Sequence, residues 1–140
     1  MVAHKTAITR KVPSAPTKWL ASRGKIIGAV LDYGCGKGFD ALAYGMDSYD
    51  PHYQPIKPRG PFDTIICNYV LNIIESPEER ARVLLTIRNL LAPGGCAYIT
   101  VRNDKKALNG TTRIGTWQGM IKLDLPVEHK CAGYVIYRLE

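Results

Sequence analysis

The feature that most constrains this sequence is a run of alternating glycines that follows a short apolar segment. Residues 29–31, Ala-Val-Leu, are apolar enough for a buried strand, and Asp32 follows them. Glycine at this density lets the main chain turn sharply and lets a ligand lie against bare backbone. The pattern predicts a strand, a binding turn and a helix whose free N–H groups attract an anionic group. The three glycines are Gly34, Gly36 and Gly38.

Three kinds of glycine-rich loop can be compared with this segment. A phosphate-binding P-loop requires Gly-Lys followed by Ser or Thr, whereas Lys37 is followed by Gly38. The dinucleotide fingerprint G-x-G-x-x-G requires its third glycine one position later than Gly38. What remains is an acidic residue, Asp32, two positions before G-x-G-x-G. This arrangement resembles motif I of class I S-adenosylmethionine (SAM) dependent methyltransferases.

The remainder of the chain alternates between strand-like and helix-like segments. A helix start is clear at Ser76-Pro77-Glu78-Glu79, where Ser76 is an N-cap, Pro77 lies in the first turn and Glu79 completes a capping box. Helices are expected at residues 15–23, with Ser14 as the N-cap, and at residues 38–44 and 77–92. Strands are expected at residues 25–33, 46–50, 64–67, 96–101, 118–125 and 133–139. These elements predict an α/β fold, a shortened Rossmann-like sheet that is mostly parallel with an antiparallel last strand.

Length and composition indicate one domain of 140 residues, with a basic arm and short helix at residues 1–24 and a core at residues 25–140. No apolar stretch approaches the roughly 18 residues that cross a bilayer, so we expect a cytoplasmic protein with no membrane partner. The four cysteines lack the close pairs of a zinc site, so no metal is expected. The sequence leaves open whether the protein forms oligomers.

The ligand crevice of a parallel sheet lies at the carboxyl ends of its strands. Asp50 ends the second expected strand, because Pro51 cannot continue a ladder. Asn68 and Tyr69 follow the third expected strand. We therefore expect these residues and the glycine segment to meet at one edge of the sheet.

From residue 4 to about residue 104 the chain resembles class I SAM-dependent methyltransferases. It more narrowly resembles the methyltransferase-like segment of methyltransferases associated with DNA phosphorothioation, and compact phage methyltransferases. The residues that carry the resemblance are His4-Lys5-Thr6-Ala7-Ile8, residues 31–38, Tyr49-Asp50-Pro51, and residues 68–75. The frame formed by Asp63 and the Pro-Gly-Gly at residues 93–95 is typical of the superfamily.

The resemblance implies SAM as the cofactor and S-adenosylhomocysteine (SAH) as its product. The ammonium group of SAM is expected at Asp32 or at backbone carbonyls of the glycine turn. The ribose is expected at Asp50, with Asp47 as the rival, and the adenine against Pro51, His52 or Tyr53. The implied cofactor-binding residues are Asp32, Tyr33, Gly34, Cys35, Gly36, Gly38, Asp50, Pro51 and Asn68, and the implied catalytic residues are Asn68 and Tyr69.

Asn68 and Tyr69 occupy the position at which N-methyltransferases carry D/N/S-P-P-Y, although both prolines are absent here. The interval of residues 54–61 also replaces a helix, a strand and the acidic residue that pairs with the adenine amino group in typical members. The resemblance thus implies a minimal core without a target-recognition domain.

The net charge of +7 is unevenly distributed. The chain before Asp32 carries lysines and arginines but no acidic residue, and a second basic stretch holds Arg102, Lys105, Lys106 and Arg113 against Asp104. Such stretches suit a polyanion, so nucleic acid is the leading acceptor. The alternatives are a small-molecule or protein methyltransferase and a non-catalytic SAM-binding partner subunit. We also expect the connection at residues 126–132 to bring Glu128, His129 and Lys130 to the active face, where His129 is a candidate base.

Overall fold

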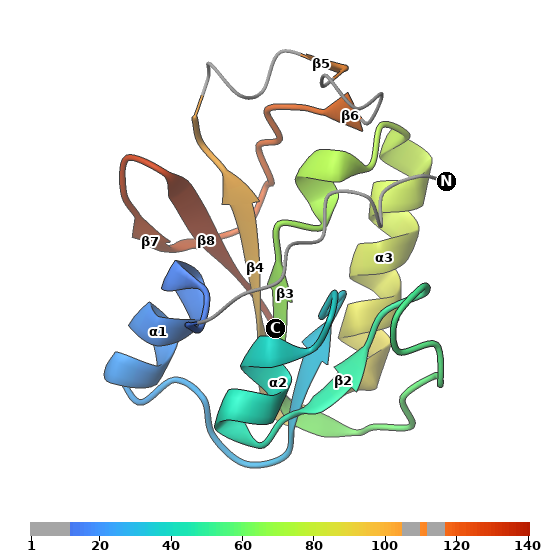
Figure 1. Ribbon diagram of the computed structural model, residues 1–140, viewed down its shortest axis with the longest axis vertical. Coiled ribbons are helices and arrows are strands. Elements are labelled where there is room, and N and C mark those ends of the chain that lie inside the picture. Colours follow the sequence, from blue (N-terminus) through green and yellow to red (C-terminus); the bar gives the residue numbers. More distant parts are fainter. Residues whose placement is uncertain (1–11, 105–109, 112–116) are drawn as a thin grey trace.

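The structure is a computed structural model that describes residues 12–104, 110–111 and 117–140. Its main sheet has six strands in the order β2-β1-β3-β4-β8-β7 (Figure 1). Four of them are mutually parallel: β1 (Val30–Tyr33), β2 (Asp47–Tyr49), β3 (Phe62–Asn68) and β4 (Leu91–Arg102). β8 (Tyr134–Leu139) pairs antiparallel with β4, and β7 (Val127–Lys130) pairs antiparallel with β8. The predicted α/β fold is confirmed.

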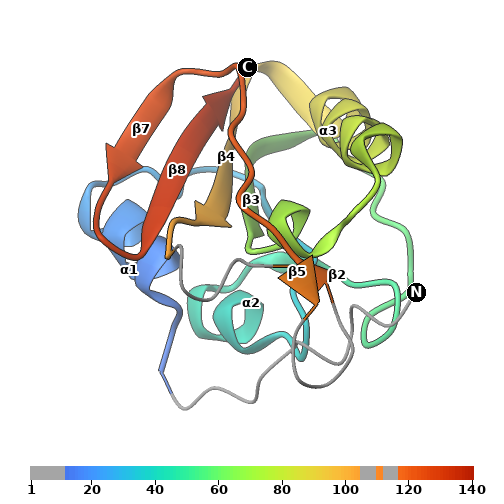
Figure 2. The same ribbon diagram turned by 90° about the horizontal axis from the view of Figure 1, so that it is seen from above.

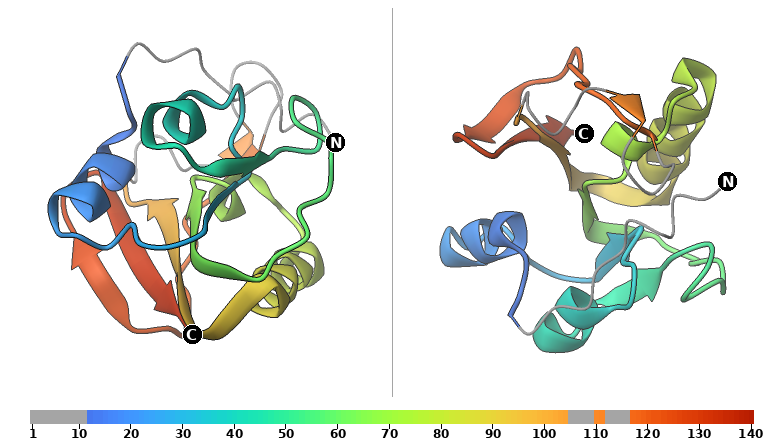
Figure 3. Two further views of the ribbon diagram at one scale, coloured as in Figure 1. Left: turned by 90° about the horizontal axis from the view of Figure 1, so that it is seen from below. Right: turned by 45° about the horizontal axis from the view of Figure 1, so that its top comes forward.

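Helices cover both faces of this sheet (Figures 2 and 3). α1 (Ala15–Ser22) and α2 (Phe39–Tyr44) cover one face, and α3 (Pro77–Leu90) covers the other together with the short 3-10 helix η2 (Leu71–Ile73). The capping signal at α3 is confirmed, because the Ser76 hydroxyl accepts a hydrogen bond from the Glu79 N–H at 3.2 Å. In the described part of the chain, no helix has the length and apolar character that a membrane span requires.

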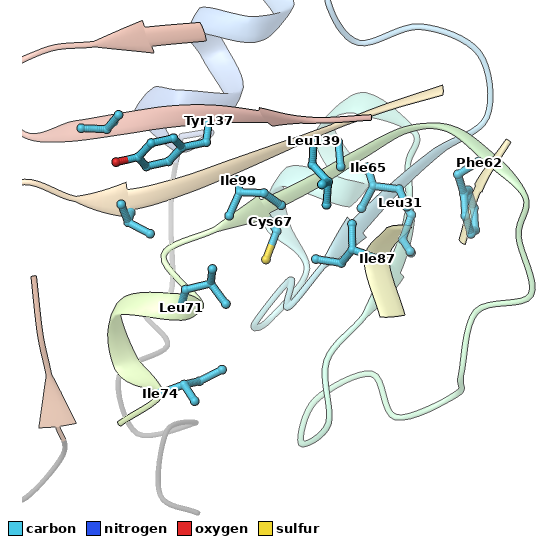
Figure 4. Packing of buried hydrophobic residues seen from close by; sticks show 13 residues of the cluster. Leu31, Phe62, Ile65, Cys67, Leu71, Ile74, Ile87, Ile99, Tyr137 and Leu139 are labelled. Carbon is cyan, nitrogen blue, oxygen red and sulfur yellow. The ribbon is translucent and has the colours of Figure 1, made fainter. Parts of the chain in front are cut away.

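Alternation along the strands divides the core into two clusters, one on each face. On β3, Ile65 and Cys67 point into the cluster under α3, whereas Ile66 points into the cluster under α1 and α2. Figure 4 shows the first cluster, in which Ile87 of α3 and Leu71 of η2 pack over the strands. All five side chains are fully buried.

Strand order determines where a ligand can bind. From β1 the chain moves outward through α2 to the edge strand β2, and then returns to β3 on the other side of β1. The strand order therefore reverses between β1 and β3, and the carboxyl ends of these two strands form the crevice that α/β sheets use for ligands. Asp32 near the end of β1 lies opposite Ile66 of β3, two residues before Asn68.

The prediction for the end of the chain was wrong about which residues form the strand before β8. Residues 119–126 form no strand, and the segment expected as the hairpin connection instead contains β7. The alternation of Ile121, Leu123 and Leu125 reflects packing against the first core cluster, not pairing in a ladder. Strand pairing starts only after Pro126, whose carbonyl accepts from the Arg138 N–H at 2.9 Å. Trp117–Gln118, named β6, instead pairs with Gly110–Thr111, named β5.

The first strand is also shorter than expected, since β1 begins at Val30 instead of residue 25. Gly28, in the segment before it, has a φ of +68°. A Cβ atom on Gly28 would lie 2.2 Å from the carboxylate of Asp63. That carboxylate accepts from the Ala29 N–H at 2.8 Å, so a tight turn, not a strand, leads into β1.

Candidate active site

A cavity of about 850 Å³ lies at the carboxyl ends of the central strands. Its volume falls in the range of small-molecule sites, about 300–1,000 Å³. All but one of the residues assigned from the sequence line it; the exception is Gly38. Gly38 is the N-cap of α2, with a φ of +83°. The lining residues among those assigned are Asp32, Tyr33, Gly34, Cys35, Gly36, Asp50, Pro51, Asn68 and Tyr69.

The glycine loop, residues 34–38, uses its first three N–H groups within the protein. The N–H groups of Gly34 and Cys35 donate to the Tyr49 carbonyl at 2.7 and 2.9 Å. The Gly36 N–H donates to Asp50 Oδ2 at 2.9 Å. A phosphate-binding loop presents such N–H groups to its ligand, whereas here they bind β2 and Asp50. The loop is therefore built for a ligand other than a phosphate.

The charges around the loop favour a cation. Asp32 is 4% exposed and lines the cavity with Asp50. The pKa of the Cys35 thiol is raised to about 12, first by burial and then by the negative charges of Asp32 and Asp50. The ammonium and sulfonium groups of SAM suit this environment, so these residues fit the cofactor that the sequence implied.

Asp50 has a structural role as well as a place in the cavity. Its Oδ1 accepts from the N–H groups of His52 and Tyr53 at 2.9 and 3.0 Å, while Oδ2 holds Gly36. The carboxylate therefore joins the glycine loop to the turn after β2. Asp47, the rival for the ribose, is exposed at the start of β2 and is absent from the lining. His52 lines the cavity, and Tyr53 does not.

A polar network of four side chains joins α1, α2 and the end of β3, and three of its members, Ser14, Thr17 and Asp40, are buried. Asp40 of α2 accepts from the Ser14 N–H at 2.9 Å, from the Ser14 hydroxyl and from the Thr17 hydroxyl at 2.8 Å. The Asn68 amide nitrogen donates to Thr17 Oγ1 at 2.7 Å and to Ser14 Oγ at 3.2 Å. The amide oxygen of Asn68 is buried and has no hydrogen-bond partner in the described part of the chain.

The sequence did not point to three members of this network. The Ser14 position matched an N-cap, and Ser14 does precede α1, but its hydroxyl makes no cap hydrogen bond. Thr17 and Asp40 belong to no motif, and their spacing gives no signal. The only available clue was the serine at a helix start.

A strained segment connects Asn68 to η2. Tyr69 has a φ of +61°, which is unusual for a residue with a side chain. Its N–H donates to the Thr100 carbonyl at 2.8 Å, which holds the segment against β4. A Cβ atom on Gly34 would lie 2.4 Å from Val70 Cγ2, so glycine is required where this segment meets the glycine loop. Strain of this kind concentrates at functional sites.

The cavity lining also contains two charged residues, Arg102 and Glu79, that the sequence did not assign to the site. Arg102, at the end of β4, lines the cavity and donates to Gln118 Oε1 at 3.2 Å. Its guanidinium lies 3.8 Å from Asp104. Glu79 also lines the cavity. The sequence placed Arg102 in the second basic stretch, as a contact for a polyanion, and the structure shows that it also lines the cavity.

His129 does not occupy the expected place. It lies in β7 and stacks on Trp19 of α1, with 4.1 Å between the ring centroids. Its neighbour Glu128 pairs with Lys25 at 3.1 Å. None of the residues 127–130 lines the cavity, so the prediction that this segment brings His129 to the active face is wrong. The basic residues 105, 106 and 113, and the arm before residue 12, lie outside the described residues.

Several solved methyltransferase structures share this fold. The structure of the DhpI–SAH complex covers 89% of this chain and 82% of its own, with a TM-score of 0.62 and 16% identity. The N-methyltransferase NodS from Bradyrhizobium japonicum WM9, in complex with SAH, covers 88% of this chain and 82% of its own at a TM-score of 0.55 and 13% identity. The glycopeptide N-methyltransferase MtfA, complexed with sinefungin, covers 73% of this chain and 60% of its own at a TM-score of 0.50 and 17% identity.

Among curated proteins, none matches this sequence. A family model described as a methyltransferase domain matches residues 7–124, which is most of the chain. The glycine loop, Asp50 and Asn68 all lie within that range. The chain therefore belongs to the methyltransferase domain family, and it is a SAM-dependent methyltransferase.

Proposed function

We propose that this chain transfers a methyl group to a nitrogen atom of an acceptor that carries negative charge. The observation that carries the proposal is the buried amide oxygen of Asn68, which has no partner among the described residues although Asn68 lines the cavity. An unpartnered acceptor in a buried site is costly, and an N–H group of a bound molecule would satisfy it.

The residues divide into two sides with different tasks. On the cofactor side, Asp32 and the carbonyls of the glycine loop would hold the ammonium group, and Asp50 the ribose. SAM supplies an electrophilic methyl group on a positively charged sulfur. On the acceptor side, Asn68 orients the nitrogen, and catalysis rests chiefly on that orientation.

The charge of the acceptor is inferred from Arg102 and from the net charge of +7. A guanidinium at the cavity binds carboxylate or phosphate through paired hydrogen bonds. Both a small anionic amine and a nucleotide base meet this requirement. The names of two structural neighbours, NodS and MtfA, describe N-methyltransferases, which agrees with nitrogen as the acceptor atom.

Methyl-labelled SAM provides the direct test. The protein would be incubated with a panel of small anionic amines, short oligonucleotides and peptides, and the products analysed by mass spectrometry. We expect the label on nitrogen in an anionic member of the panel. Label on oxygen or carbon would contradict the proposal. Binding of SAH by calorimetry without transfer to any member would favour the non-catalytic SAM-binding subunit.

A nucleic-acid acceptor, the leading prediction from the sequence, has its own test. Lys105, Lys106 and Arg113 would contribute through counterion release, at about one unit of log–log salt slope for each phosphate contact. Replacing all three with Gln should weaken oligonucleotide binding and flatten its salt dependence while leaving SAH affinity unchanged. An unaltered slope would favour the small anionic acceptor. The narrower resemblance to methyltransferases associated with DNA phosphorothioation and to phage enzymes also stays a prediction.

A further inference from the structure

The polar network joins three elements that are far apart in sequence. Thr17 comes from α1 and Ser14 from the N-cap position just before it, Asp40 comes from α2, and Asn68 from the end of β3. Ser14, Thr17 and Asp40 are 2%, 0% and 7% exposed. Buried polar groups of this kind make hydrogen bonds with defined donors and acceptors. These donors and acceptors restrict which group of Asn68 can face the two hydroxyls.

The carboxylate of Asp40 can only accept hydrogen bonds. The Thr17 hydroxyl donates to Asp40 Oδ2, and the Ser14 hydroxyl has two acceptors, the same Oδ2 and Thr17 Oγ1 at 3.0 Å. With either acceptor, both hydroxyl protons are used among Ser14, Thr17 and Asp40. Only lone pairs then remain on the two hydroxyl oxygens. The group of Asn68 that faces them must be a donor, which is the NH₂ group. The amide oxygen is therefore turned away from α1.

We propose that Asp40, acting through Ser14 and Thr17, is a positioning residue that holds the Asn68 amide so that its oxygen meets an N–H group bound at the position of the transferred methyl. The second half of this statement rests on the proposed function. The first half concerns only the orientation of a side chain, so the two can be tested separately.

A purely structural network would be arranged differently. The Ser14 hydroxyl lies at the N-cap position of α1, where serine ordinarily accepts a hydrogen bond from the helix, yet it makes no such bond. The network also leaves one of its own oxygens buried without a partner among the described residues. A network that only joined α1 to α2 would gain by capping the helix and by satisfying Asn68. Both departures preserve the orientation of the amide.

Sinefungin and SAH are suitable probes. Sinefungin carries an amino group where SAM carries the methyl group, and SAH carries nothing there. If the Asn68 oxygen accepts from that amine, the wild-type protein should bind sinefungin about tenfold or more tightly than SAH by calorimetry, the scale of a hydrogen bond to a charged donor. Equal affinities would overturn the role of Asn68, and failure of both to bind would overturn the proposed function.

Asp40→Asn tests the positioning role. An amide at position 40 can donate a hydrogen bond to a hydroxyl. The Ser14 and Thr17 protons are then no longer all directed within the network, and the Asn68 amide can rotate by 180°. The preference for sinefungin should fall severalfold while SAH affinity stays within about twofold. Thr17→Val should act in the same direction, and Thr17→Ser should restore the preference. Thr64→Val is the matched control, because the buried Thr64 hydroxyl donates to the Ile27 carbonyl at 2.7 Å, outside the network. An unchanged preference in Asp40→Asn and Thr17→Val would overturn the proposal.

A measurement on the wild-type protein covers the case in which these variants do not fold. The side-chain NH₂ protons of Asn68 should exchange slowly with solvent and show nuclear Overhauser contacts to Thr17. Rapid exchange, or no contact with Thr17, would contradict the inferred orientation without any variant.

Discussion

The proposed function divides the cavity into a cofactor side and an acceptor side, and the two are built in different ways. On the cofactor side, the hydrogen bond from Gly36 to Asp50 joins residues 14 positions apart. On the acceptor side, Asn68 bonds to residues 51 and 54 positions away, and Ser14 bonds to Asp40 at a separation of 26. The first side is formed within one strand–loop–helix–strand segment. The second requires α1, α2 and β3 to be packed correctly.

This difference indicates where each side is vulnerable. The cofactor side depends on the backbone conformation of the glycine loop and on two carboxylates, Asp32 and Asp50, so a single substitution in the loop should abolish cofactor binding. The acceptor side depends on the docking of α1, so changes there should separate methyl transfer from cofactor binding. The predictions below test this contrast, beginning with the largest expected effect.

Gly36→Val should abolish SAH binding. Gly36 has a φ of +58°, a conformation that a β-branched residue rarely adopts, and its N–H holds Asp50. Calorimetry with SAH measures the loss. Gly94→Val is the matched control, because Gly94 also has a positive φ of +78° but has open space around it and is absent from the cavity lining. Normal SAH binding by Gly36→Val would show that the loop conformation is not required.

Asp50→Ala should weaken SAH binding by about 1.5–3 kcal/mol, the scale for hydrogen bonds to a charged group. The loss combines the ribose contact with the release of the three N–H groups that Asp50 now holds. Asp47→Ala should have a clearly smaller effect, since Asp47 is exposed at the start of β2 and does not line the cavity. A reversed order in the calorimetric affinities would assign the ribose to Asp47.

Asn68→Ala should separate the two sides. Once an acceptor is known from the labelling experiment, the rate of transfer should fall about tenfold, because one orienting hydrogen bond to the nitrogen is lost. SAH affinity should change by less than about threefold. A parallel loss of both would mean that Asn68 serves the cofactor and not the acceptor.

Cys35→Ala should have the smallest effect, below about 0.5 kcal/mol in SAH affinity, because the loop acts through its backbone at this position. The raised pKa of about 12 keeps the Cys35 thiol neutral throughout the physiological range, since a thiol ionises only as the pH approaches its pKa. Alkylation of Cys35 should therefore stay slow at pH 8 and accelerate only in strong alkali, whereas the exposed Cys131 should react at pH 8. Mass spectrometry of the alkylated peptides would detect rapid modification of Cys35, which would contradict this.

The sequence alone determined the fold class and predicted most of the residues on the proposed cofactor side. The apolar run, the acid and the alternating glycines specify a strand and a turn through local backbone preferences, and Asp50 was predictable because proline ends the strand after it. The helix at Ser76 was also predictable, because a capping box acts within one turn. Each of these signals depends on residues close together in the chain.

Only the tertiary structure decided the acceptor side and the end of the chain. Thr17 and Asp40 belong to the network only through contacts between elements far apart in sequence. They are buried, and their hydrogen bonds are fixed, only after α1 packs against the sheet. The alternation at residues 121–125 predicted a strand because packing against a sheet and pairing within it leave the same pattern of apolar residues. Strand pairing depends on backbone hydrogen bonds, which carry no side-chain signature, so β7 at residues 127–130 was visible only in the folded protein.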